Sequence, residues 1–104
     1  MAAPYNPPKR GEDFVIQIAL EDMALPGSFK ANPSLASGDV KISKDGGAFA
    51  NLNTLPTVTP ASGISVQVTL SATEMTADVV FVQFVDQTSP KEWADFAFSI
   101  PTTT

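Results

Sequence analysis

The eight residues Val79–Asp86 constrain the fold of this chain more than any other segment. They read Val-Val-Phe-Val-Gln-Phe-Val-Asp, contain no glycine or proline, and form the most apolar and β-branched run in the sequence. A run of this length and composition predicts a β-strand that is covered on both faces. We assign Val80, Val82 and Phe84 to the core. An ordinary antiparallel strand needs only one apolar face, so the second face requires a cover of its own.

Four other segments show the alternation of apolar and polar residues that is typical of a half-buried strand. They are residues 12–20, 39–43, 64–70 and 92–100. Their inward-facing side chains are expected to be Phe14, Ile16, Ile18, Leu20, Val40, Ile42, Ile64, Val66, Val68, Leu70, Phe96, Phe98 and Ile100.

Turn-forming residues separate these segments. Residues 44–47 supply the positive φ angles of a tight hairpin, so 48–52 is expected to return with Phe49 at the edge of the core. Residues 55–61 contain two prolines, which favour an edge segment or a crossover over a central strand. Pro26–Gly27 favours a further hairpin return.

Ser71 and Glu74 have the spacing of a capping box, in which each side chain accepts a hydrogen bond from the other residue's backbone N–H. This spacing predicts one short helical turn that folds Met75 over an end of the core. Together the segments predict an all-β fold, an immunoglobulin-like antiparallel β-sandwich of six to seven strands. A small barrel is the alternative architecture.

A chain of 104 residues has room for one domain. Residues 12–101 are expected to form the sandwich and residues 102–104 a polar tail. Residues 1–11 are expected to form an extended arm, because three prolines favour polyproline II. Tyr5 is the only aromatic residue of the arm, and it is either part of a frayed terminus or an anchor on a neighbouring subunit.

The residue types present exclude most catalytic chemistry. The chain has no histidine and no cysteine, which excludes histidine-dependent triads, cysteine nucleophiles and cysteine-ligated metals. We expect no enzymatic activity and no cofactor. Asp86 and Asp95 offer a carboxylate pair of the kind a glycosidase uses, but solvated charge also explains them. A calcium site at a loop is a further possibility that the sequence leaves open. Its oxygen ligands would come from Asp45, Asn51 and Asn53, or from Glu21 and Asp22. The preference of these residue types for turns explains the same positions without a metal.

Charge and hydropathy restrict the partners. The net charge is −5 with no cluster of Lys and Arg, which argues against nucleic acid. No apolar run approaches the ~20 residues of a membrane span. Charged residues make up 16% of the chain, below the ~25% of an average soluble domain, so much of the surface is neutral. That composition suits a protein partly covered by neighbours.

The outer face of the Val79–Asp86 strand is the candidate interface. Val79, Phe81 and Val85 point away from the core, and Trp93 of the last strand is expected to point the same way. Four such side chains on one sheet face form an apolar patch, which usually marks an interaction surface. The alternative is that this face is covered within the domain.

Several segments together resemble small structural proteins of tailed bacteriophages. They are an Asn-Pro-x-Leu-Ala segment at 32–36, the segment Gly-Asp-Val-Lys-Ile-Ser-Lys-Asp-Gly-Gly-Ala-Phe-Ala-Asn-Leu at 38–52, Leu-Ser-Ala-Thr-Glu-Met-Thr-Ala-Asp at 70–78, and a Glu-Trp pair at 92–93. The resemblance covers about residues 32–100. It implies a virion-associated β-sandwich without enzymatic activity or catalytic residues. The lack of a secretory signal pattern and of cysteine is compatible with a virion component made in the host cytoplasm.

Two functions follow from this resemblance. The first is a structural protein that decorates or cements a capsid, or sits on a tail, and contacts other virion proteins and copies of itself. The second is a receptor- or glycan-binding module of a tail fibre. Its contact loops are residues 87–91 and the turn formed by Lys44, Asp45, Gly46 and Gly47. A carbohydrate-active enzyme is a third alternative, which the short chain disfavours. No small-molecule substrate, membrane or nucleic acid is expected as a partner.

Overall fold

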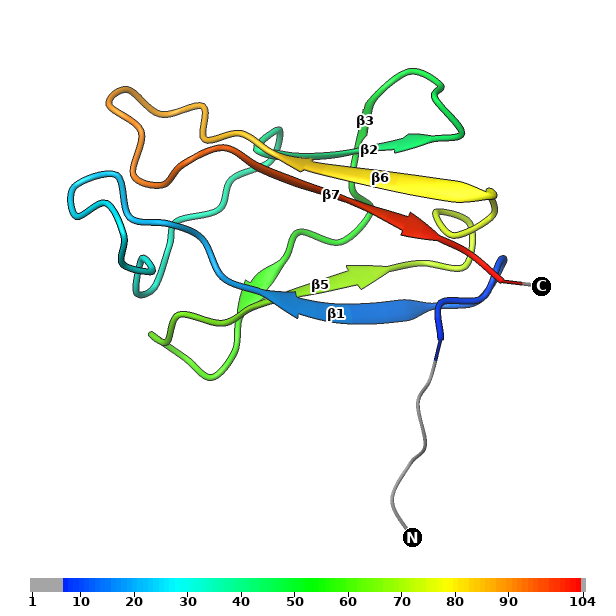
Figure 1. Ribbon diagram of the computed structural model, residues 1–104, viewed down its shortest axis with the longest axis horizontal. Helices are drawn as coiled ribbons and strands as arrows, with labels where there is room; N and C mark the ends of the chain where they lie inside the picture. Colours follow the sequence, from blue (N-terminus) through cyan, green and yellow to red (C-terminus); the bar gives the residue numbers. More distant parts are fainter. Residues whose placement is uncertain (1–6, 104) are drawn as a thin grey trace, which may run out of the picture.

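Seven strands form two antiparallel sheets that lie in two layers (Figure 1). The structure is a computed structural model and describes residues 7–103. The strands are β1 (Phe14–Ile18), β2 (Val40–Lys44), β3 (Ala50–Asn51), β4 (Thr57–Val58), β5 (Val66–Leu70), β6 (Val79–Phe84) and β7 (Phe96–Pro101). One sheet has the order β1-β5-β4 and the other β3-β2-β6-β7. The prediction of an all-β fold is confirmed, and the two layers are those of a β-sandwich.

Strand β6 lies inside the four-stranded sheet, between β2 and β7. Its exposure alternates, and Val80, Val82 and Phe84 are fully buried, as predicted. Neighbouring strands cover both of its edges, which explains why the segment tolerates neither proline nor glycine. The most apolar run in the chain is therefore a central strand whose inner face lies wholly in the core.

The core lies between the two sheets and is closed by residues from the loops. Strand β5 contributes Val66, Val68 and Leu70, all buried, while β1 contributes side chains that are only partly buried. Leu20, Met75 and Trp93 complete the core from segments outside the strands. Because β1 lies at the end of its sheet, its inward-facing residues keep part of their surface open to solvent.

The segment after β5 is a hydrogen-bonded turn, and no helix occurs in residues 7–103. The N–H of Ser71 donates to the Glu74 carboxylate over 2.9 Å, and the N–H of Glu74 donates to the Ser71 hydroxyl over 3.2 Å. These are the reciprocal bonds of a capping box. They fold the buried Met75 under the turn, as the spacing predicts.

The prediction that Trp93 points outward is wrong, because Trp93 is 0% exposed. Residues 92–94 do not continue β7. They pair with the loop after β1. Trp93 forms an antiparallel β-bridge with Asp22, and the N–H of Ala94 donates to the carbonyl of Glu21 over 2.9 Å. This separate pairing breaks the alternation assumed for 92–100 and turns the indole into the core, where it packs edge-on against Phe84.

Two smaller predictions are also wrong. Phe49 does not reach the core but lies outside the sheet, 47% exposed, with its ring 6.1 Å from that of Phe81. Ile64 is exposed because β5 begins two residues later, at Val66. The edge position predicted for 55–61 is confirmed, since β4 lies at the end of its sheet. The hairpin predicted at Pro26–Gly27 is also confirmed, since Phe29 forms an antiparallel β-bridge with Glu21.

The two ends of the described chain lie together. Lys9 and Thr103 form a parallel bridge, in which the N–H of Arg10 donates to Thr103 and the N–H of Thr103 donates to Pro8. Thr102 is fixed as well, because its hydroxyl donates to the carbonyl of Ala77 over 2.6 Å. The last residues of the predicted arm are thus attached to the sandwich. Tyr5 lies outside the described residues.

Candidate functional site

The predicted interface residues do not form one patch. Val79 is 41% exposed, and Phe81 and Val85 are half-buried on the same outer face of β6. Phe49 covers part of Phe81, and Trp93 is buried on the opposite side of the sheet. The internal cover that the sequence left as an alternative is therefore present in part. This face therefore exposes a modest apolar surface, and each of its predicted aromatic anchors packs against other residues of the same chain.

The charged groups of the 44–47 turn are engaged within the chain. The Asp45 carboxylate accepts hydrogen bonds from the N–H groups of Val79 and Asp78, at 2.9 and 3.0 Å, and these bonds hold the pKa of Asp45 below its usual value. Lys44 Nζ donates to the carbonyl of Thr73 over 3.0 Å. Asp45 and Gly46 have φ angles of 51° and 77°, as a tight turn requires. The turn thus joins the β2 end to the start of β6.

Two buried carboxylates hold the loops at the other end of the sandwich. Asp39 accepts from the N–H groups of Ala36 and Gln87, at 3.0 and 3.1 Å. Asp86 accepts from the hydroxyl of Thr88 over 2.6 Å and from the N–H of Glu92 over 2.7 Å. Asp39 therefore joins its own loop to Gln87, 48 positions later in the chain, whereas Asp86 holds the loop that follows it.

Burial of Asp86 acts to raise its pKa, but the hydrogen bonds from Thr88 and Glu92 outweigh this effect and leave the pKa below its usual value. Asp95, the other member of the suggested glycosidase pair, is exposed and forms an ion pair with Lys91 instead. A general acid requires a raised pKa. The lowered pKa of Asp86 therefore does not suit this residue to the role of general acid.

The suggested calcium ligands also have partners within the chain. The Glu21 carboxylate accepts from the N–H of Gly27, and Asp22 accepts from the N–H of Ala24 over 2.9 Å. Among residues 7–103, no group of three or more acidic side chains is placed to hold a metal ion. These carboxylates stabilise the turn between β1 and β2, which is the role that turn propensity predicts.

A partly open apolar surface lies where the two sheets end side by side. Strand β1 ends the three-stranded sheet and β7 ends the four-stranded sheet, and both lie at the front in Figure 1. We call this surface the β1/β7 edge. It is formed by Phe14, Ile16, Ile18, Phe29, Phe96 and Phe98.

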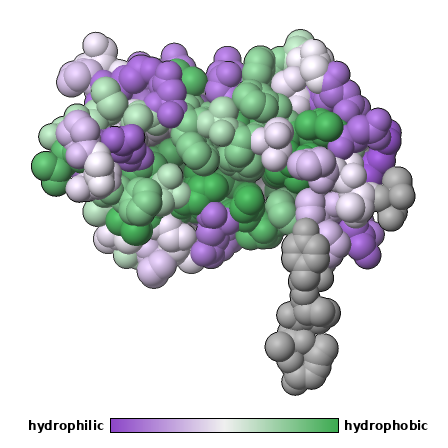
Figure 2. Space-filling view, viewed as in Figure 1, coloured by the Kyte–Doolittle hydropathy of each residue, from purple (hydrophilic) through white to green (hydrophobic). Residues whose placement is uncertain are grey.

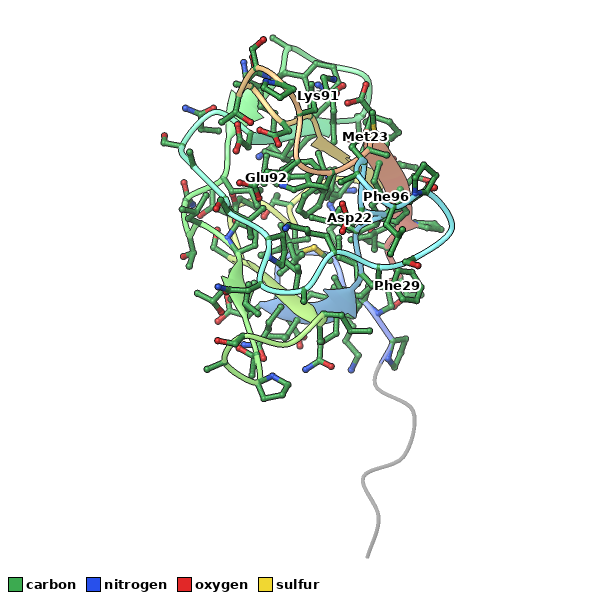
Figure 3. The ribbon with its side chains drawn as sticks, turned by 90° about the vertical axis from the view of Figure 1, so that its left-hand side faces the viewer. Asp22, Met23, Phe29, Lys91, Glu92 and Phe96 are labelled. Carbon is green, nitrogen blue, oxygen red and sulfur yellow. The ribbon has the colours of Figure 1, made fainter. Side chains whose placement is uncertain are left out.

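The side chains of this edge are partly open. Phe29 is 60% exposed and Phe96 is 37% exposed. Figure 3 shows both on the same side of the molecule, with Asp22 nearby and Met23 above Phe96 in this view. Figure 2 shows green, apolar residues across the middle of this face, with purple, polar residues densest at its right end and along its upper rim. A hollow of about 270 Å³, lined by Gln83, Val85, Asp95 and Ala97 among others, adjoins Phe96 on the outer side of the sheet.

The four sheet edges differ in how they are protected. Strands β3 and β4, at the far edges, are two residues long, and Pro56 and Pro60 flank β4 closely. Short edge strands with nearby prolines resist pairing with other chains. Strands β1 and β7 have five and six residues and contain no charged side chain. Their outer edges therefore lack the charges that commonly protect an edge strand.

Sequence reasoning missed the β1/β7 edge, although part of the signal is present. The absence of charge from 14–18 and 96–101 can be read from the sequence. Which strands lie at the ends of their sheets cannot be read from it, because that depends on pairing between distant segments.

In the part of the chain that the structure describes, no helix has the length and apolar character needed to span a membrane.

Comparison with known proteins gave no match, whether to a protein-family model, a curated protein or a solved structure.

Proposed function

We propose that this protein is a non-enzymatic structural component of a tailed-phage virion that acts through protein–protein contacts at the β1/β7 edge. The observation that carries the proposal is the pair of long, uncharged, apolar edge strands on one face. Apolar surface of this kind marks an interaction site, since it aggregates unless a partner covers it. The sequence resemblance of residues 32–100 supports a phage origin and favours a capsid-decorating or tail-associated protein.

The non-enzymatic role is supported by the acidic side chains. Asp39, Asp45 and Asp86 all use their carboxylate oxygens to accept hydrogen bonds from the chain's own loops. Carboxylates that hold loops in this way are structural. With no histidine or cysteine in the sequence, few groups remain for acid–base or nucleophilic catalysis.

We further infer that the sandwich is immunoglobulin-like. The order β1-β5-β4 corresponds to strands B, E and D of that fold, and β3-β2-β6-β7 corresponds to C′, C, F and G. In this assignment strand A has no full counterpart within residues 7–103. Its place beside β7 is taken only by the bridge between Lys9 and Thr103.

The test is binding to particles that lack the protein. Purified chain is added to such capsids or tails, and bound protein is measured by sedimentation and located by electron microscopy. Ala97→Lys, which puts a charge on the exposed edge strand, is expected to abolish binding. Ala48→Lys, at an alanine beyond β2 that is also exposed, is the matched control and is expected to bind normally.

Equal binding by the two variants would refute a role for the β1/β7 edge. Binding to host cells instead of particles, lost when residues 44–47 are replaced, would support the receptor-binding alternative and contradict the structural one.

A further inference from the structure

The turn that follows β2 contains a chemically reactive pair of residues. Asp45 and Gly46 form the only Asp-Gly pair in the 104 residues, and no Asn-Gly pair occurs. In such a pair the backbone nitrogen of the glycine can attack the side chain of the aspartate before it. Glycine has no Cβ, so its nitrogen approaches with the least hindrance. Residues 44–47 are all exposed, so water also reaches this position.

The reaction needs no reagent besides water. The nitrogen of Gly46 bonds to Cγ of a protonated Asp45 carboxyl group and loses its proton, while one carboxyl oxygen leaves as water. The product is a succinimide ring. Water then adds to either ring carbonyl. Opening at the carbonyl next to Cα leaves the chain joined through Cγ, so the backbone gains a methylene group and residue 45 becomes isoaspartate.

The backbone of the folded turn opposes closure of this ring. Asp45 and Gly46 both have positive φ, 51° and 77°, and the N–H of Gly47 donates to the carbonyl of Lys44 over 2.9 Å. These features define a type I′ turn, in which ψ of the first central residue is about +30°. With that ψ, Cβ of Asp45 and the nitrogen of Gly46 lie on opposite sides of the Cα–C bond. Ring closure needs them on the same side, as in a type II′ turn, so the turn must open first.

The start of β6 holds both the side chain and the backbone of Asp45. The N–H groups of Val79 and Asp78 donate to Oδ1 of Asp45, over 2.9 and 3.0 Å. The N–H of Asp45 donates in turn to the carbonyl of Val79 over 3.0 Å. Ring closure turns Cγ toward Gly46 and removes one of its oxygens, so the carboxylate bonds to β6 are lost on the way.

The same hydrogen bonds keep the Asp45 carboxylate ionised. Its oxygen leaves as water only after protonation, so the ionised form resists attack. The hydrogen bonds from Val79 and Asp78 hold the pKa of Asp45 below its usual value, and the charges of Arg10 and Lys44 act in the same direction. The carboxylate of Asp78 itself is paired with Arg10. At a given pH, the reactive protonated form of Asp45 is therefore scarcer in the folded chain than in the unfolded chain.

We propose that Asp45–Gly46 is the site at which this chain isomerises its own backbone through a succinimide, and that the type I′ turn and its bonds to β6 suppress the reaction in the folded protein. An isomerised residue 45 cannot restore these contacts. Its longer backbone no longer fits a two-residue turn, and its free carboxylate is attached directly to Cα. An opening of the turn during which the ring forms is therefore not reversed by refolding. This inference does not depend on the proposed function.

The test compares the native chain with the same chain in urea, where the turn is absent. Both are incubated at neutral pH, and isoaspartate is located by proteolysis, chromatography and enzymatic methylation. In urea, we expect isoaspartate at residue 45 before any other aspartate. In the native chain we expect it at the same residue but about tenfold or more slowly, because the turn opens only transiently. Equal rates, or faster isomerisation of another aspartate in urea, would overturn the proposal.

Three variants separate the chemistry from the fold. Asp45→Glu is expected to abolish the signal in urea, because its larger ring closes much more slowly. Lys44→Ala removes a hydrogen bond to the carbonyl of Thr73 and a positive charge near Asp45. It is expected to raise the native rate about two- to fivefold, the effect of an exposed charged contact, and to leave the rate in urea unchanged. Lys41→Ala, on the same strand, is the matched control and should react as the wild type does. A native rate that Lys44→Ala leaves unchanged would contradict suppression by these contacts.

The pH dependence of the rate gives an independent readout. In urea the rate is expected to level off as the pH falls below the unfolded-state pKa of about 3.9. In the native chain it should continue to rise to lower pH, over the range in which circular dichroism shows the fold intact. Coincident profiles would contradict the role assigned to the hydrogen bonds from Val79 and Asp78.

Discussion

Replacement of Asp86 by asparagine tests whether its buried carboxylate holds the 86–94 loop. Asparagine has nearly the same shape but presents an NH₂ group where one carboxylate oxygen accepts the N–H of Glu92, at 2.7 Å. The hydrogen bonds from Thr88 are retained on the other oxygen and weakened by loss of charge.

The expected loss follows from these contacts. A hydrogen bond to a charged group contributes about 1.5–3 kcal/mol, and a buried N–H left without an acceptor costs about 1–3 kcal/mol. We expect Asp86→Asn to lower the free energy of unfolding by about 3 kcal/mol. For a domain of this size, that loss lowers Tm by about 12 °C or more.

The effect depends on pH in a defined direction. The pKa of Asp86 is lowered in the folded protein, so its contribution is complete above the unfolded-state pKa of about 3.9 and is lost as the pH falls through the folded-state pKa. The difference between wild type and Asp86→Asn is therefore expected to be largest near neutral pH. It should shrink progressively below about pH 4.

Denaturant unfolding, followed by the fluorescence of the single tryptophan, measures both effects. Asp95→Asn is the control, because the Lys91–Asp95 ion pair is exposed and contributes at most about 1 kcal/mol. An Asp86→Asn variant as stable as the control, or a difference from wild type that is equal at pH 7 and pH 3, would refute this account of Asp86.

Three further predictions concern other contacts. Trp93→Phe removes the indole N–H that donates to the carbonyl of Ser34 over 3.1 Å and opens a small cavity. Thermal unfolding followed by circular dichroism should show a loss of about 2 kcal/mol in the free energy of unfolding, whereas Phe49→Leu should change it little. Ser71→Ala is expected to cost about 1 kcal/mol in chemical denaturation, as for other caps, and Glu74→Ala more, because Glu74 also accepts from the N–H of Asn53 over 2.8 Å. Carboxyl resonances in an NMR titration should show Asp45 titrating below the usual range of an aspartate, and a pKa at or above that range would contradict the hydrogen bonds from Val79 and Asp78.

The strands were predictable where the determining pattern is local. The alternation in β5 and β6 and the spacing of Ser71 and Glu74 each specify their structure within a few residues, and the structure agrees. Side chains on a strand alternate whatever the strand pairs with, so the buried face of β6 could be assigned from the sequence alone.

Trp93 and the β1/β7 edge were missed for one physical reason. The orientation of Trp93 is set by pairing with Asp22, seventy-one positions earlier in the chain, and nothing near Trp93 in the sequence indicates that partner. The exposure of Phe96 likewise depends on β7 having a neighbour on one side only. Long-range pairing of this kind has no local signature, so an alternation extrapolated from β7 back to Trp93 puts the indole on the wrong face.

Pro8 and Thr103 lie side by side, so residues 8–103 begin and end at the same place in the fold. The carbonyl of Pro8 lies 2.9 Å from the N–H of Thr103, so a few added residues suffice to join the two positions covalently without distorting either sheet. Backbone cyclisation, or circular permutation with new ends in an exposed turn, is therefore compatible with this architecture. Joining the two positions lowers the conformational entropy of the unfolded chain much more than that of the folded chain, in which they are already adjacent. A cyclic form of the sandwich is therefore expected to be more stable without any new contact.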